Sequence, residues 1–254
     1  MKKIILSLIT IVYWSSCSQK QAEKGNNDSV EISTASKDSV ATDDTKKEVL
    51  YLEDILPCVD LQGLEKKFGK ENIKKDAIIE TGEGQFNATK LFPDTDKEVE
   101  VYWKDGKDFK EIQDVMVRVK VADDGGLALK SSWVSREGLR MGMRLSEVVA
   151  LNGKTFTMTG IGWDLGGTVM CWEGGKLDKK NVSVRFNDYS GNQAGLTEKE
   201  YSSISGEREF DTAHSVIQKL NPSVDQLNVS VKLEIDAELG QKMTKEVERK
   251  QMPR

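Results

Sequence analysis

The feature that most constrains the fold is a similarity between two stretches of the chain. Residues 55–69 can be laid on residues 139–153 at an offset of 84, and each stretch ends in a glycine. The matching apolar pairs are Ile55/Leu139, Val59/Met143, Leu61/Leu145 and Leu64/Val148. Glycine favours the left-handed conformation that ends many helices. We therefore expect a short helix in each stretch, ending at its glycine.

Two further matches follow in the same order along the chain. Val99, Val101 and Trp103 match Val182, Val184 and Phe186 at an offset of 83. Val115, Val117, Val119 and Val121 match Val229, Val231, Leu233 and Ile235 at an offset of 114. Alternation of apolar and polar residues is typical of half-buried strands. The ordered matches predict a duplication, with extra residues inserted in the second copy at 187–221.

Hairpin signals complete the expected sheet. Residues 156–163 and 168–173 flank the turn sequence Asp164-Leu165-Gly166-Gly167, and residues 112–121 lead through Asp124-Gly125 to residues 127–134. The expected fold class is α+β, with two tandem helix-plus-antiparallel-sheet repeats in two layers. The first repeat is assigned to residues 49–134 and the second to residues 135–240. A charged tail, residues 241–254, follows them.

The N-terminus reads as a targeting segment. Lys2 and Lys3 precede a largely apolar run at residues 4–14, which is too short to span a bilayer, and small residues then lead to Cys17. This pattern predicts a signal peptide at residues 1–16. Residues 17–48 contain few apolar side chains and are expected to form a disordered tether.

These residues also carry a resemblance to known proteins. Residues 1–17 resemble the bacterial lipoprotein signal, in a looser form similar to that of Bacteroidota lipoproteins. The resemblance implies that Cys17 is lipidated after cleavage. Secretion with cleavage near Ser16, and an uncleaved anchor, remain the alternatives. Because Ser18 follows the cysteine instead of Asp, the signal also implies an outer-membrane lipoprotein of the cell envelope that faces the periplasm.

A second resemblance concerns the folded part. Gly142-Met143, Glu147-Val148 and Gly153-Lys154 form a pattern similar to that of the BamE/SmpA-like small outer-membrane lipoproteins. The pattern is also similar to the tandem repeats of β-lactamase inhibitor protein. Residues 139–186 resemble a group of uncharacterised bacterial lipoproteins. These resemblances imply a module that binds another envelope protein through an open sheet face, without catalysis.

Composition restricts the chemistry further. The chain has one histidine, His214, which argues against Ser-His-Asp or Cys-His catalysis and against a multi-histidine metal site. We expect His214 at the surface, in a short helix capped by Asp211. The net charge of −5 argues against nucleic acid as a partner. The sequence thus predicts a non-enzymatic protein with no catalytic residues, cofactor or metal.

Candidate binding residues gather around one hairpin and the inserted segment. They are Trp163, Asp164, Trp172 and Tyr189. Core packing is the ordinary role of such aromatic side chains, but aromatic residues at a sheet face also anchor partners. An alternative function is therefore binding of carbohydrate or a small ligand by stacking. The two remaining cysteines, Cys58 and Cys171, either form a disulfide or pack as free thiols, and both readings stay open.

Overall fold

The computed structural model describes residues 49–231, with gaps at 82–83, 107, 122–126 and 129–130. The predicted signal peptide, the lipidation site Cys17, the tether and the charged tail lie outside the described residues. So do Leu233 and Ile235, the end of one predicted strand.

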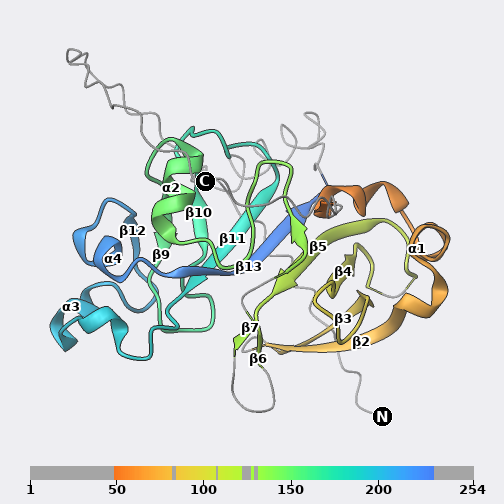
Figure 1. Cartoon of the computed structure of the whole chain (residues 1–254), viewed down its shortest axis with the longest axis horizontal. Coiled ribbons are helices and arrows are strands. Elements are labelled where there is room, and N and C mark those ends of the chain that lie inside the picture. Colours follow the sequence, from red (N-terminus) through yellow and green to blue (C-terminus); the bar gives the residue numbers. More distant parts are fainter. Residues whose placement is uncertain (1–48, 82–83, 107, 122–126, 129–130, 232–254) are drawn as a thin grey trace, which may run out of the picture.

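The centre of the protein is a six-stranded antiparallel sheet with the order β11-β13-β5-β4-β3-β2. Its strands are β2 (Ile73–Thr81), β3 (Gly84–Leu91), β4 (Val99–Trp103), β5 (Ile112–Arg118), β11 (Val182–Asn187) and β13 (Ser223–Ser230). The central pair, β5 and β13, joins the two halves of the chain. We call this the main sheet (Figure 1).

A smaller sheet continues beyond β11. It has the order β10-β9-β12, formed by β9 (Thr157–Thr159), β10 (Val169–Cys171) and β12 (Glu209–Asp211). An antiparallel bridge between Thr168 and Arg185 links it to the main sheet. Two short ladders remain: β1 (Leu50–Tyr51) pairs in parallel with β8 (Trp133–Val134), and β6 (Lys120–Val121) pairs with β7 (Leu127–Ala128).

The described part of the chain contains four α-helices: α1 (Leu61–Phe68), α2 (Leu145–Asn152), α3 (Glu198–Ser203) and α4 (Ser215–Leu220). In Figure 1, α1 lies at the end of the molecule with β2–β4, and α2, α3 and α4 lie towards the other end. Both predicted helices are confirmed, since α1 ends at Gly69 and α2 at Gly153. The structure also confirms the coarse α+β class.

One face of the main sheet carries the core. Val99, Val101, Val115, Val117 and Leu227 are fully buried or nearly so, and they form one apolar cluster with the helices. Leu64 of α1, Val148 of α2 and Ile217 of α4 belong to the same cluster. The alternation predicted for the strands therefore describes the side that the helices cover, which we call the core face.

Asn152 fixes the chain beyond the end of α2. This side chain is only 1% exposed, and its Nδ2 donates to the carbonyl oxygens of Lys154 and Trp172, both at 3.0 Å. Its Oδ1 accepts from the amide of Leu177 at 3.1 Å. A Cβ on Gly175 would lie 2.2 Å from this Oδ1. Asn152-Gly153 and Gly174-Gly175 thus pack against each other, and this contact joins the end of α2 to the segment that precedes β11.

Several expectations from the sequence are wrong in detail. Val59, matched to the buried Met143, is 56% exposed because the backbone has a positive φ there. The strand predicted to begin at Val229 is β13. It begins six residues earlier, at Ser223, and ends at Ser230. The helix near His214 begins at Ser215, so its N-cap residue is His214 and not Asp211.

The predicted hairpins have mixed outcomes. The pairing of β9 with β10 confirms the hairpin around residues 164–167, although its strands are shorter than expected. Trp133 and Val134 do not extend the other hairpin, because they pair with β1 instead. The inserted segment folds into η4 (Gln193–Gly195), α3, β12 and α4.

Candidate binding site on the open sheet face

The second face of the main sheet is polar, and we call it the open face. Strand register places on it side chains that alternate with those of the core face. Its half-buried members are Lys90, Tyr102, Asp114, Met116, Arg118, Ser183, Arg185, Gln226, Asn228 and Ser230, and Glu100 is buried among them. Within the described residues none of the four α-helices packs on this face, and its charged and amide groups are suited to binding.

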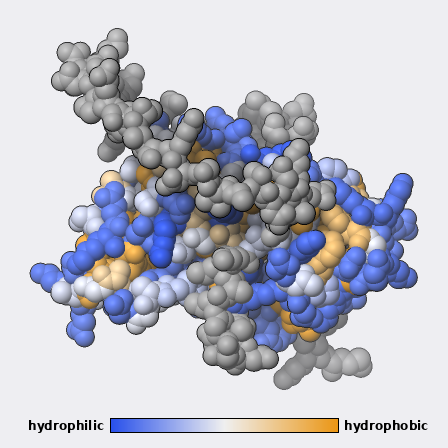
Figure 2. Space-filling model, viewed as in Figure 1, coloured by the Kyte–Doolittle hydropathy of each residue, from blue (hydrophilic) through white to orange (hydrophobic). Residues whose placement is uncertain are grey.

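A small apolar cluster lies at the β2–β3 end of this face. Ala77, Ile79 and Ala88 are buried there, with Tyr102 packed against them. Phe86, the register partner of Ile79, is 42% exposed on the same face, whereas Ile78 is 61% exposed and alternates onto the other side of the hairpin. On the side of the molecule in view, Figure 2 shows separate hydrophobic areas on a mainly hydrophilic surface. The apolar part of the face is therefore a local feature beside the charged part.

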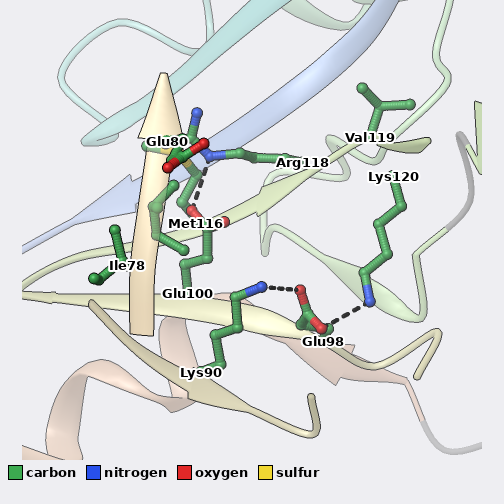
Figure 3. Close-up of a pocket in the computed structure, with 10 residues that line it drawn as sticks. Ile78, Glu80, Lys90, Glu98, Glu100, Met116, Arg118, Val119 and Lys120 are labelled. Atoms are coloured by element: carbon green, nitrogen blue, oxygen red, sulfur yellow. Dashed lines mark hydrogen bonds and ion pairs between the residues drawn. The ribbon is translucent and has the colours of Figure 1, made fainter. Parts of the chain in front are cut away.

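A cavity of about 270 Å³ opens on the charged part, and we call it the hollow. It is lined by Ile78, Ile79, Glu80, Lys90, Glu98, Glu100, Met116, Arg118, Val119 and Lys120 (Figure 3). Because β2 and β5 are separated by two strands in the sheet order, the sheet must curl for both to line one cavity. Three cations and three carboxylates thus come together from five strands, β2 to β6, and the segment before β4.

Glu98 holds two of these cations. Its Oε1 accepts from Lys90 Nζ at 3.0 Å, its Oε2 lies 2.9 Å from Lys120 Nζ, and Oε2 also accepts from the amide of Asp94 at 2.6 Å. Burial alone would raise the pKa of Glu98, but these hydrogen bonds and the charge of Lys90 lower it below its ordinary value. The carboxylate therefore stays ionised and keeps both ammonium groups in the hollow (Figure 3).

Glu100 holds the third cation. Its Oε2 accepts from Arg118 Nε at 2.8 Å and from the hydroxyl of Tyr102 at 2.7 Å, and Arg118 Nη2 donates to the Tyr102 oxygen at 2.9 Å. Burial and the charge of Glu100 raise the pKa of Tyr102 well above its ordinary value. The phenol stays neutral, so Arg118 is fixed by one carboxylate and one hydroxyl.

A second arginine is fixed in the same way across the central strands. Arg185 makes two hydrogen bonds of 2.9 Å to Asp225, which is fully buried, and the Tyr189 hydroxyl donates to the same carboxylate at 2.9 Å. In register, Gln226 is the partner of both Arg118 and Arg185. The two guanidinium groups therefore belong to one row of the open face, with an amide between them.

The residues predicted to bind have different fates. Trp172 is packed in the core: it is 8% exposed, its ring centroid lies 4.9 Å from that of Phe156, and its Nε1 donates to the Val182 carbonyl. Trp163 is half-buried, with its Nε1 bonded to the Gly160 carbonyl, and Asp164 beside it is exposed. Tyr189 reaches the open face. Trp172 and Tyr189 therefore do not share one stacking surface.

The structure also shows the surroundings of Cys58 and His214. Cys58 carries a free thiol, so it is not bonded to Cys171, and burial raises the pKa of this thiol. His214 is half-buried and its ring lies 5.7 Å from that of Phe210. Among the described residues, no group of three or more His, Cys, Asp or Glu side chains could hold a metal ion. Within the same part of the chain, no helix is long and apolar enough to cross a membrane.

No known protein family, curated protein or solved structure matches this chain. The candidate site therefore depends on its own geometry. Sequence reasoning missed Lys90, Glu98, Arg118 and Lys120, although a signal was present. Glu98, Glu100 and Tyr102 alternate with the buried valines of β4, and Arg118 and Lys120 continue the alternation of β5. Such alternation shows which residues of a strand share a face, but not which strands come together to line a cavity.

Proposed function

We propose that this chain is a lipid-anchored cell-envelope protein whose folded part binds another protein without catalysis, as an assembly or inhibitor module. The observation that carries the proposal is the open face, where fixed charges adjoin the exposed Phe86. Protein interfaces combine a few apolar anchors with polar and charged groups, and arginine is enriched in them. Arg118 and Arg185 are already ordered by buried partners, which lowers the entropy lost on binding.

The proposed anchor gives this face its setting. Lipidation at Cys17 would attach the protein to the outer membrane on its periplasmic side, with residues 18–48 as the tether. Replacing Cys17 by alanine should abolish metabolic labelling with an alkyne fatty acid and release the protein from the membrane fraction. Labelling that persists in this variant would contradict lipidation at Cys17.

We also propose that the two halves are tandem repeats, as in β-lactamase inhibitor protein. The order of strands supports this, because α1 precedes β2-β3-β4-β5 and α2 precedes β9, β10, β11 and β13. The offset of 114 relates Val115 to Val229, and these two residues are direct partners across β5 and β13. A local two-fold axis at this pair would relate the halves, which is the geometry expected of a duplicated sheet joined at equivalent strands.

Site-specific photo-crosslinking tests the proposed function. A photoreactive residue at Ser183 or Gln226 would report on the open face, and one at the exposed Gln218 of α4 serves as the matched control. In cells that produce the full chain, we expect one adduct of discrete mass from both open-face positions and not from Gln218. Equal adduct patterns from all three positions, or none from the open face, would refute protein binding there.

A further inference from the structure

We propose that the hollow receives a carboxylate, presented by an aspartate or glutamate side chain of the bound protein; this rests on the proposed function of the open face. The reason is an excess of hydrogen-bond donors over acceptors in the hollow. Its cations are positioned by carboxylates that are already saturated or nearly so, which leaves donors directed at an incoming group.

Arg118 supplies the main donor pair. Among the described residues, only its Nε and one N–H of Nη2 are engaged, by Glu100 and Tyr102. A guanidinium has five N–H groups in one plane, so the edge formed by Nη1 and Nη2 still offers two parallel donors. That edge matches the two oxygens of a carboxylate. The fixed inner edge orients the outer one before any ligand arrives.

The two lysines add further positively charged donors. Within the described part of the chain, Lys90 Nζ bonds to Glu98 alone, and Lys120 Nζ bonds to Glu98 and to the Thr95 carbonyl. An ammonium has three N–H donors. Lys90 therefore keeps two donors and Lys120 keeps one, whereas Glu98 already accepts from three groups.

The carboxylates of the hollow set the charge balance. Glu98 and Glu100 pair with Lys90, Arg118 and Lys120, which leaves one positive charge in excess in the inner part of the hollow; the third carboxylate, Glu80, makes the lining as a whole neutral. Glu80 stands at the rim, exposed, with its Oε1 accepting from Gln85 at 3.0 Å. Its negative charge opposes an incoming carboxylate and limits the affinity. This makes Glu80 a residue whose removal should strengthen binding, which a purely structural role would not produce.

The volume indicates the size of the group. A cavity of about 270 Å³ has room for one acidic side chain with some water, but not for a folded element. Ile79 of the open face lines the same cavity and offers an apolar contact to the methylene groups of that side chain. An acidic residue beside an apolar one is thus the partner feature that fits this surface.

Nuclear magnetic resonance can test this with a small probe. The purified chain is titrated with N-acetyl-glutamate N-methylamide, and the neutral glutamine analogue serves as the matched ligand control. We expect the Arg118 Nε–H signal to shift in a saturable way with the glutamate compound only. Equal shifts with both compounds, or shifts spread over the whole surface without saturation, would overturn the proposal.

Three variants make the test specific. Glu80→Gln should tighten the binding of the glutamate probe about threefold, the effect of one unit charge about 6 Å away in water. Arg118→Lys should weaken it about tenfold, since the charge remains but the paired donors are lost. Lys104→Gln, which removes an exposed cation paired with Glu111, should leave it unchanged. If neither Glu80→Gln nor Arg118→Lys changes the affinity for the glutamate probe, the proposal is overturned.

The test of the carboxylate site and the test of protein binding on the open face can fail independently. Crosslinking from Ser183 and Gln226 does not require a carboxylate in the hollow. Discrete adducts together with no response of Arg118 to the glutamate probe would retain protein binding and overturn the carboxylate site. A saturable Arg118 response without adducts would support the hollow and contradict protein binding on this face.

Discussion

Replacing Asn152 by alanine should test how the second half of the chain is held together. The change removes an amide that satisfies two carbonyl groups and one N–H group at a site only 1% exposed. A buried polar group left without a partner costs about 1–3 kcal/mol. Three such groups, with water reaching some of them, predict a loss of about 3–5 kcal/mol in the free energy of unfolding.

The contact with Gly175 turns this into a double-mutant cycle. A Cβ at residue 175 would lie 2.2 Å from Asn152 Oδ1, so Gly175→Ala alone should cost about 1–3 kcal/mol through overpacking. In the Asn152→Ala background the obstructing side chain is gone. The double variant should therefore be more stable than the sum of the single losses predicts, by at least about 1 kcal/mol.

Equilibrium unfolding in urea measures both the cost of Asn152→Ala and its coupling energy with Gly175→Ala. Asn87→Ala is the matched control, because this asparagine is exposed on β3 and its loss should change stability by under about 0.5 kcal/mol. A cost for Asn152→Ala below about 1 kcal/mol, or strictly additive single losses, would refute the reasoning that this side chain and Gly175 form one joint.

Three further predictions concern single sites. Gly167→Ala should cost more than about 3 kcal/mol in denaturant unfolding, because φ is +77° and a Cβ would lie 1.9 Å from the Phe186 carbonyl oxygen. A wild-type-like midpoint would contradict this. Glu98→Gln should lower stability at neutral pH. The pKa of Glu98 is depressed on folding, so its contribution is present above its unfolded value of 4.5 and is lost as the pH falls through the lower folded value. Unfolding curves of the two proteins should converge as the pH falls below the depressed pKa of Glu98, and a constant difference across pH would exclude that origin. Asp225→Asn should cost about 3 kcal/mol, since it leaves Arg185 without its buried counter-charge; calorimetry with no loss of melting temperature would contradict this.

Local sequence signals account for much of the backbone. Gly69 and Gly153 mark the ends of α1 and α2 because glycine tolerates the positive φ found at both positions. Alternating valines predict β4, β5 and β11 because one side of the main sheet is buried. The same logic fails for β13, where a bulge opposite Arg185 and Phe186 changes the alternation. A bulge depends on the partner strand and leaves no local sequence signal.

The candidate site was less accessible from sequence. The place of Trp172 at a strand end predicts that its side chain faces a ligand. The side chain turns inward because the Val182 carbonyl of the neighbouring strand accepts its N–H, which removes the usual cost of burying an indole. The hollow depends on the curl of the sheet, since Glu80 of β2 and Arg118 of β5 line one cavity. Curl is a property of the whole sheet, so no short stretch of sequence predicts it.

The proposed duplication explains why the hollow is on one half only. At an offset of 83, Val99, Val101 and Trp103 correspond to Val182, Val184 and Phe186, and all six are buried on the core face. The alternating positions differ: Glu100 corresponds to Ser183, and Tyr102 to Arg185. Packing restricts the core face to apolar residues in both halves, whereas the open face is free to change. The carboxylate that fixes Arg118 therefore has no counterpart on β11, and Arg185 needs Asp225 of β13 instead. If both halves descend from one unit, specificity for a partner arose on the open face after duplication, and the variants that change binding without unfolding the protein should lie there.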